Sequence, residues 1–330
     1  MNPRIQNVEI FSAGGSQPQR RSNQAGFPRW LWLSVFAMRG LCAQEQAEPL
    51  AEPAHAIPTT HDHAGRIVAP VRVNGQGPFR FVVDTGATHS VLSLDLAHKL
   101  LLQPDKTANT SVTLSGVTGS TRAAVVTVQS LQVGDLLLEQ RRVPVLDAVF
   151  AGADGVLGAD GLQDMRLTVD FRNDSITIEK STLRAAPRYF FAIPFDIKFG
   201  SLLVANAKVG GVRVKAIIDT GAERTLGNPA LRRALRVGLD PHRRPASTDV
   251  EGVTADLQSG DMIQAPTIAI GGVKINQTDV TFGDLHVFKV WDYERRPALL
   301  VGMDVLGVLD VLVIDYARQE LQLRPAGAGR

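Results

Sequence analysis

Short apolar runs separated by glycine-containing turns dominate the chain. In the segment RIVAPVRVNGQGPFRFVVDTG, which begins at Arg66, apolar and polar residues alternate on both sides of Asn74-Gly75. Alternation around an Asn-Gly turn is typical of a β-hairpin. The segment SLLVANAKVGGVRVKAIIDTG, which begins at Ser201, repeats the pattern with Gly210-Gly211 at the turn. The sequence therefore predicts a mostly β protein.

Helical signals are few and short. Ser93 before LDLAHKLL is a favourable N-cap, and Asn228-Pro229 before ALRRAL combines an N-cap with proline at the first helical position. A third pair of short helices is expected after Gly158, in ADGLQDM, and after Gly302, in MDVLGVL. The helices thus recur at matching places in the two halves of the chain.

This recurrence extends to several motifs and indicates an internal duplication. FVVDTGATHSVLS at Phe81 is matched by AIIDTGAERTLGN at Ala216. Three more motifs recur in the same order: AIP at Ala56 and Ala192, GVT at Gly116 and Gly252, and VLGADGL at Val156 with LVGMDVL at Leu300. The spacing is far longer than the repeats of roughly 20 to 50 residues found in solenoids and propellers. We therefore predict two homologous lobes, residues 64–183 and 184–330, which a pseudo-twofold axis can relate.

The N-terminal segment has the order of a secretory signal. Residues 1–43 carry five arginines against one glutamate, followed by the apolar run WLWLSVFAM and the small residues of GLCAQEQA. This predicts a signal peptide and export to the periplasm or the cell exterior, with an N-terminal membrane anchor and membrane association as the alternative. Residues 44–63, rich in Ala, Glu, Pro and His, are expected to form a flexible lead-in.

Composition then excludes several kinds of chemistry. The formal net charge of +2 leaves no basic footprint for a nucleic-acid partner. Cys42 is the single cysteine, so disulfides, a cysteine nucleophile and a cysteine-rich metal site are not expected. His61 and His63 lack a third ligand nearby and fit an ordinary polar strand or loop. No metal or cofactor is therefore predicted.

The two Asp-Thr-Gly turns are the main candidates for chemistry. Asp84 and Asp219 each end an apolar strand, and a pseudo-twofold axis would bring the two carboxyl groups face to face. Two carboxyl groups this close cannot both ionise easily, so one keeps a proton while the other is charged. Such a pair can activate a water molecule for attack on a carbonyl group. Gly86 and Gly221 would let the two turns approach closely.

Hydroxyl groups in the turns have candidate support roles. Thr85 and Thr220 are placed to form hydrogen bonds across the axis to the backbone of the opposite lobe. Ser90 and Thr225, six residues after each aspartate, are placed to brace the turns from below. A purely local turn role for Ser90 and Thr225 is an equal alternative.

These motifs resemble the retropepsin-like branch of the aspartic proteases, within the wider pepsin and retropepsin superfamily. DTGATHSVL and DTGAERTL are similar to the catalytic signature of that family, and VLGADGL and LVGMDVL to its second signature. The resemblance extends from about Ile57 to Leu323. It implies one closed β lobe per half, Asp84 and Asp219 as the catalytic dyad, and a hairpin flap over the cleft. With both motifs in one chain, it implies a monomer.

The resemblance also implies where a substrate would lie. The flaps map to LSGVTGSTRA and VEGVTADLQ, and an extended peptide or protein segment would bind between flap and cleft floor as an added strand. The residues implied to contact substrate are those of the flap tips and those next to the dyad: Gly116, Val117, Thr118, Gly252, Val253, Thr254, Ala87, Ala222, His89 and Arg224. His89 and Arg224 have simple solvation as their alternative.

The sequence thus predicts an exported aspartic endopeptidase. Its alternative is a non-catalytic peptide-binding module on the same duplicated fold, but such a module gains nothing from two facing carboxyl groups. The stretch LHVFKVWDYERRPA from Leu285 is longer than its counterpart in the first lobe and is expected to be either a recognition loop or a surface hairpin. Because Ala87 and Ala222 lack the hydroxyl that a serine would offer to the dyad, we expect activity to extend toward mildly acidic or near-neutral pH.

Overall fold

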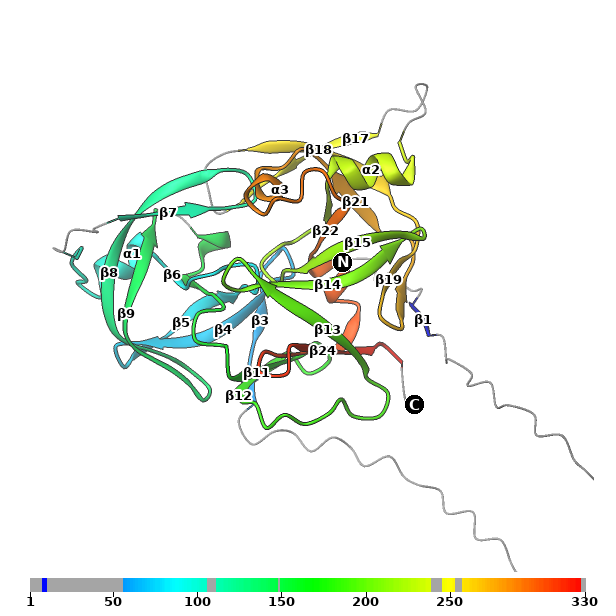
Figure 1. Cartoon of the computed structure of the whole chain (residues 1–330). Coiled ribbons are helices and arrows are strands. Elements are labelled where there is room, and N and C mark those ends of the chain that lie inside the picture. Colours follow the sequence, from blue (N-terminus) through cyan, green and yellow to red (C-terminus); the bar gives the residue numbers. More distant parts are fainter. Residues whose placement is uncertain are drawn as a thin grey trace, which may run out of the picture.

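Figure 1 shows the computed structural model of the chain, in which residues 8–10, 56–105, 111–147, 149–238, 245–252 and 257–327 are described. Most of these residues lie in β-strands, as predicted. The segment predicted as a signal or anchor lies outside the described residues, except for β1 (Val8–Ile10), which pairs with β20 (Val273–Ile275). No helix among the described residues is long and apolar enough to cross a membrane.

The N-terminal lobe is one eight-stranded sheet. Its strand order is β3-β4-β5-β10-β6-β9-β8-β7, and an additional β4–β8 pairing brings distant strands of the sheet together. The strands are β3 (Thr60–His61), β4 (Ile67–Val73), β5 (Gln76–Val83), β6 (Val91–Ser93), β7 (Ser111–Ser115), β8 (Ser120–Val133), β9 (Leu136–Leu146) and β10 (Gly155–Leu157). A single 3-10 turn, Phe150–Gly152, precedes β10.

The C-terminal lobe repeats this plan. Its central strands run in the order β17-β18-β21-β16-β22-β15-β14, β19 pairs with β14, and β20 pairs with β19. The strands are β14 (Leu202–Val209), β15 (Val212–Ile218), β16 (Leu226–Gly227), β17 (Ala246–Val250), β18 (Gln258–Gln264), β19 (Ile268–Ile270), β21 (Asp279–Phe282) and β22 (Ala298–Val301).

A six-stranded part of a 16-stranded sheet joins the lobes and continues through β13 to β14. Its order, β13-β24-β23-β11-β12-β2, has three strands from each half. These are β2 (Ile57–Pro58), β11 (Met165–Asp170), β12 (Ser175–Lys180), β13 (Phe191–Lys198), β23 (Leu309–Asp315) and β24 (Glu320–Pro325). At its centre β11 and β23 are antiparallel, with Thr168 opposite Val313. Since β2, β11 and β12 correspond to β13, β23 and β24, the sheet is symmetric about a pseudo-twofold axis.

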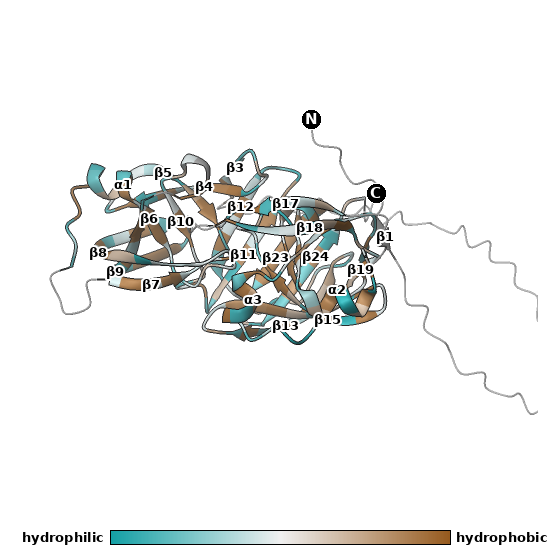
Figure 2. Ribbon diagram, turned by 90° about the horizontal axis from the view of Figure 1, so that it is seen from above, coloured by the Kyte–Doolittle hydropathy of each residue, from teal (hydrophilic) through white to brown (hydrophobic). Residues whose placement is uncertain are grey.

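The two predicted hairpins form with tight turns. Asn74 and Gly75 both have positive φ, 51° and 72°, and Gly210 and Gly211 likewise have 52° and 85°. Positive φ at both central positions is the geometry that matches the twist of paired strands, and Asn and Gly tolerate it best. The alternating residues then place one face of each hairpin in the core. Figure 2 shows that hydrophobic residues concentrate in the strands, whereas α1 and α2 carry hydrophilic stretches.

Helices form at three of the four places where the sequence predicts them. α1 (Leu94–Lys99) starts at Ser93, whose side chain accepts the N–H of Leu96, and α2 (Pro229–Leu235) starts at Asn228. α4 (Met303–Leu306) follows Gly302 as expected. The corresponding residues after Gly158 form turns instead of a helix. The N–H of Leu162 donates to the carbonyl of Ala159 at 3.2 Å, so the chain closes a tight turn there.

The predicted flexible lead-in needs a correction at its C-terminal end. Within residues 44–63, Ile57–Pro58 pairs with β12 and Thr60–His61 pairs with β4. His61 Nδ1 lies 3.5 Å from a carboxylate oxygen of Asp174. The described chain is therefore already structured at residues 57–61, because Ile57 supplies an apolar edge that packs against the main core.

Candidate active site

The candidate active site lies where the first hairpin of each lobe ends. Asp84 follows β5, and its N–H donates to the carbonyl of Leu157 at 3.0 Å. Asp219 follows β15, and its N–H donates to the carbonyl of Val301 at 3.1 Å. These partners end β10 and β22, the strands that pair in parallel with β5 and β15. Equivalent strands thus hold both aspartates in equivalent positions.

Glycine in each turn lets the two carboxyl groups meet. A Cβ built on Gly86 would lie 2.6 Å from Cγ of Asp219, and one built on Gly221 would overlap Cγ of Asp84. Each carboxyl group therefore packs against the glycine backbone of the opposite turn. Both aspartates are buried, with 8% and 6% of their surface exposed.

Two threonines tie the turns together across the axis. The Thr85 hydroxyl donates to the carbonyl of Ile218 at 2.8 Å and accepts the N–H of Thr220 at 3.1 Å. The Thr220 hydroxyl donates to the carbonyl of Val83 at 2.7 Å and accepts the N–H of Thr85 at 3.1 Å. These are the cross-axis hydrogen bonds expected from the sequence. They fix the separation of the two turns.

A hydroxyl below each turn contacts a second aspartate. Ser90 donates through its N–H and its hydroxyl to Oδ1 of Asp160, both at 2.7 Å. Thr225 donates its N–H to Asp304 at 2.9 Å and its hydroxyl to the same carboxylate at 2.6 Å. The partners are 70 and 79 residues apart in sequence, so these bonds link distant segments and do not close a local turn.

The two acceptors, Asp160 and Asp304, carry no role in the sequence-based prediction. Each lies two residues after the glycine of the second signature, Gly158 or Gly302, whose N–H also donates to the Ser90 or Thr225 hydroxyl at 3.1 Å. An aspartate two residues after the second-signature glycine in both repeats is the sequence signal that could have identified Asp160 and Asp304. Burial raises the pKa of Asp304.

The environment makes the two catalytic candidates unequal. Burial raises the pKa of both Asp84 and Asp219. The negative charge of Asp84 raises the pKa of Asp219 further. The N–H groups of the following glycine and alanine donate to Oδ1 of each aspartate at 2.8 to 3.1 Å. Ala87 and Ala222 thus meet the dyad through their backbone.

The flap of the N-terminal lobe is docked on the C-terminal lobe. At the β7–β8 turn the N–H of Gly116 donates to the carbonyl of Gly119 at 2.8 Å. The carbonyl of Val117 accepts the N–H of Val287 at 3.2 Å, and Val117 packs against an apolar cluster of the other lobe. Ser120 Oγ lies 3.0 Å from Nε2 of His286. Figure 1 shows this turn beside α3 (His286–Val290).

The second predicted flap contacts the turn of the first flap through Gly252. A Cβ built on Gly252 would lie 2.8 Å from Oγ1 of Thr118, which is buried. Val253 and Thr254 lie outside the described residues. His89 and Arg224 are both exposed, and Arg224 lies 3.7 Å from the carboxylate of Glu223. Contact of His89 and Arg224 with substrate stays a prediction.

The long segment from Leu285 is not a surface hairpin. It forms α3 and a following turn, and Leu285, Phe288 and Tyr293 are buried in the cluster that receives Val117. Nδ2 of Asn228 also donates to the carbonyls of Tyr293 and Arg296. The segment therefore covers the flap tip, and deletion of residues 290–296 would remove part of a buried core.

Removal of the Ser120 hydroxyl is expected to loosen the flap. Ser120→Ala deletes the side-chain contact with His286. Because a hydrogen bond contributes about 0.5 to 1.5 kcal/mol, the fraction of molecules whose flap has separated from α3 should rise roughly 2- to 10-fold. Hydrogen–deuterium exchange of the Val287 amide, which donates to Val117, measures this opening. Ser111→Ala, on the same hairpin but away from α3, is the control. Equal exchange in Ser120→Ala and wild type would contradict the docking role.

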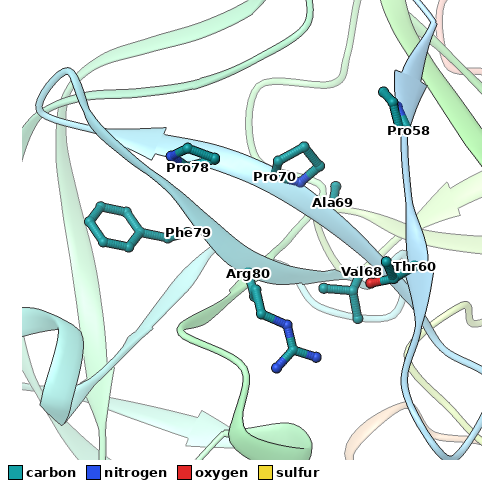
Figure 3. A pocket seen from close by; sticks show the side chains of 8 residues that line it. All are labelled: Pro58, Thr60, Val68, Ala69, Pro70, Pro78, Phe79 and Arg80. Carbon is teal, nitrogen blue, oxygen red and sulfur yellow. The ribbon is translucent and has the colours of Figure 1, made fainter.

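A pocket of about 230 Å³ lies elsewhere, on the N-terminal lobe (Figure 3). It is bordered by Pro58, Pro70, Phe79 and Arg80, from β2 and the β4–β5 hairpin. Neither aspartate of the dyad lines it. Among the described residues no group of three or more His, Cys, Asp or Glu side chains is arranged to hold a metal ion.

The duplicated turns, the interlobe sheet and the facing carboxyl groups together define a two-lobed retropepsin-like protein. A comparison with protein families agrees, since the family described as aspartyl protease matches the chain twice, in residues 69–161 and 205–305. No curated protein matches the chain. The chain belongs to the aspartyl protease family, whose members hydrolyse peptide bonds.

Proposed function

We propose that the protein is an aspartic endopeptidase that cleaves extended polypeptides with a water molecule bound between Asp84 and Asp219. The observation that carries the proposal is the pair of buried carboxyl groups, each packed against the glycine of the opposite turn. Two such groups sharing one proton supply a base and an acid within the same site.

The reaction follows from the unequal environments. Ionised Asp84 accepts a proton from the water as its oxygen bonds to the peptide carbonyl carbon, and protonated Asp219 gives its proton to the carbonyl oxygen. The product of this step is a neutral tetrahedral diol, with the proton now on Asp84. Transfer of that proton to the peptide nitrogen breaks the C–N bond, and Asp219 recovers a proton from the diol as the carboxylic acid forms.

The substrate is proposed to bind as an extended strand beneath the flap. The β7–β8 turn reaches across to α3 of the C-terminal lobe, and a peptide beneath this turn would meet backbone groups of the flap. The flap residues Gly116, Val117 and Thr118 are the proposed contacts. A monomer suffices, because one chain supplies both aspartates.

The competing function is a peptide-binding module without turnover. The experiment that separates the two is incubation of purified protein with a broad peptide library, with mass spectrometry of the products. An endopeptidase gives new internal termini that a peptide containing a transition-state-mimicking hydroxyl suppresses. Peptide retention with no new termini would favour the binding module. For protein recovered from the secreted fraction, the same spectra identify the mature N-terminus and test the proposed export.

The alanines beside the dyad lead to a prediction for pH dependence. A serine hydroxyl at position 87 or 222 would add a donor to the ionised carboxylate, and about 1.4 kcal/mol corresponds to one pKa unit. Ala87→Ser combined with Ala222→Ser is therefore expected to move the acid limb of the kcat/KM profile to lower pH by up to roughly one unit. Initial rates between pH 2 and 8 measure it, and an upward shift would show that desolvation outweighs the new hydrogen bond.

A further inference from the structure

The duplication breaks down at one buried position beside the dyad. Arg66 precedes β4, and the equivalent position before β14, at the same offset as Asp84 and Asp219, holds Ser201. Both residues are buried, with 9% and 7% of their surface exposed. One lobe therefore buries a permanent cation where the other buries a small hydroxyl.

Arg66 crosses the lobe boundary to the opposite catalytic turn. Its Nε donates to the carbonyl of Gly221 at 2.7 Å, and Nη1 lies 3.2 Å from Oδ2 of Asp62. The guanidinium also lies 4.3 Å from the ring centroid of Phe150. A planar guanidinium held by a carbonyl, a carboxylate and an aromatic ring has a fixed position. The positive charge is therefore immobile next to the dyad.

Ser201 provides no counterpart to this charge. Its buried hydroxyl has no hydrogen-bond partner among the described residues, while its N–H donates to the carbonyl of Lys198 at 3.1 Å. The backbone hydrogen bonds at the two aspartates are matched in number and nearly in length. The Arg66 charge thus distinguishes the surroundings of the two carboxyl groups.

We propose that Arg66 is a positioning residue that makes the dyad unequal, so that Asp84 carries the negative charge and Asp219 carries the proton. This inference rests on the proposed function, since it assigns base and acid within that site. Arg66 acts through the turn that carries Asp219 and through its charge, and it touches no reacting atom.

The charges around the dyad support this assignment. Arg66 lowers the pKa of Asp84, partly offsetting the effect of burial, whereas Asp84 raises the pKa of Asp219. Tyr316 is also within electrostatic reach of Asp84, but burial and the charge of Asp84 raise the pKa of Tyr316, so it stays neutral. The side chain of Asp62 is only 3% exposed, and its negative charge neutralises part of the Arg66 charge. The bracing carboxyls Asp160 and Asp304 lie behind their turns, each bound to a hydroxyl.

The test uses two variants with opposite expected shifts. Arg66→Met removes the charge and keeps an apolar stem against Phe150, so the acid limb of the kcat/KM profile should move up. Asp62→Asn leaves the Arg66 charge less neutralised, so the limb should move down. We expect shifts of roughly 0.5 to 1 pH unit, smaller than the 1 to 3 units of a direct aspartate–arginine pair. Arg66→Lys keeps the charge and should leave the limb near its wild-type position.

A purely structural role for Arg66 would give a different result. Loss of packing would lower the melting temperature and kcat in both variants, with both acid limbs unmoved or both moved in one direction, and this outcome would overturn the proposal. Arg72→Met serves as the control, because Arg72 is an exposed arginine on β4 with a 3.5 Å contact to the carbonyl of Gly75.

A second readout does not depend on turnover. Carbon-13 NMR of labelled aspartate carboxyl groups follows the two ionisation steps of the dyad directly. In Arg66→Met the first step should move to higher pH, and in Asp62→Asn to lower pH. If wild type cleaves no peptide but these shifts appear, the proposed function fails and the unequal dyad stands. If peptides are cleaved and the shifts are absent, the Arg66 assignment fails alone.

Discussion

Asp84→Asn and Asp219→Asn are each expected to reduce peptide hydrolysis by roughly 10⁴-fold, the upper range for a lost general acid or base. The reason is that one carboxyl group cannot serve as base and acid in the same step. Asparagine keeps the size of the side chain and an acceptor for the N–H bonds of the turn. The measurement is kcat/KM with purified monomer on a peptide from the cleaved library.

A variant that fails to fold would also lose activity. Measuring the melting temperature of each variant as a function of pH distinguishes this case from loss of catalysis. Burial raises the pKa of both carboxyl groups, so the folded pair keeps a proton that two unfolded aspartates lose near pH 4. Wild type therefore loses stability as the pH rises above about 4, and each Asn variant should lose less.

Asp95→Asn, on the exposed start of α1, is the control for both measurements. It should retain wild-type turnover and the wild-type dependence of melting temperature on pH. Substantial hydrolysis by either dyad variant, with exchange of lobes between chains excluded, would overturn the assignment of Asp84 and Asp219.

Thr85→Val and Thr220→Val are expected to cost the most stability of any single conservative change at the site. Each substitution keeps the shape of the side chain but leaves a buried N–H and a buried carbonyl of the opposite turn without a partner. An unsatisfied buried group costs about 1 to 3 kcal/mol, so each variant should lose roughly 2 to 6 kcal/mol. Typical domains are stable by about 5 to 15 kcal/mol, so this loss is a large fraction.

Urea unfolding at fixed pH measures this loss. Thr113→Val on β7 is the matched control, because Thr113 is exposed and far from the axis, and it should change the free energy of unfolding by less than about 0.5 kcal/mol. The rate of peptide hydrolysis provides a second measure. It should fall in both variants, because loss of the cross-axis hydrogen bonds lets the two carboxyl groups move apart. Wild-type stability in either variant would mean that water replaces the lost hydroxyl.

The repeated parts of the fold were predictable because they rest on local signals. Asn74-Gly75 requires a tight turn, Ser93 and Asn228 satisfy helix N-termini, and the apolar runs before Asp84 and Asp219 give strands buried on both faces. The hydrogen bonds of Thr85 and Thr220 followed from the duplication itself. Symmetry placed these residues together without any knowledge of the loops between them.

The remaining features depend on contacts between segments that differ in the two halves. Arg66 is one of many arginines in the sequence, and only the folded chain brings it to the carbonyl of Gly221. The contact of Ser120 with His286 joins residues 166 positions apart, and α3 has no counterpart in the first lobe. The turn after Gly158 shows the same limit, since a short apolar stretch fits a helix or a turn equally well.

The symmetric sheet between the lobes has a consequence for how such a chain diversifies. A homodimer must place any new residue on both sides of its axis, so a cation beside one aspartate appears beside the other as well. Here one polypeptide supplies β11 and β23 as separate stretches of sequence, and each half accepts substitutions on its own. Covalent fusion of the halves thus lets each half change independently. A residue such as Arg66 can arise beside one catalytic turn, and a helix such as α3 in the other lobe, without either change being copied across the axis.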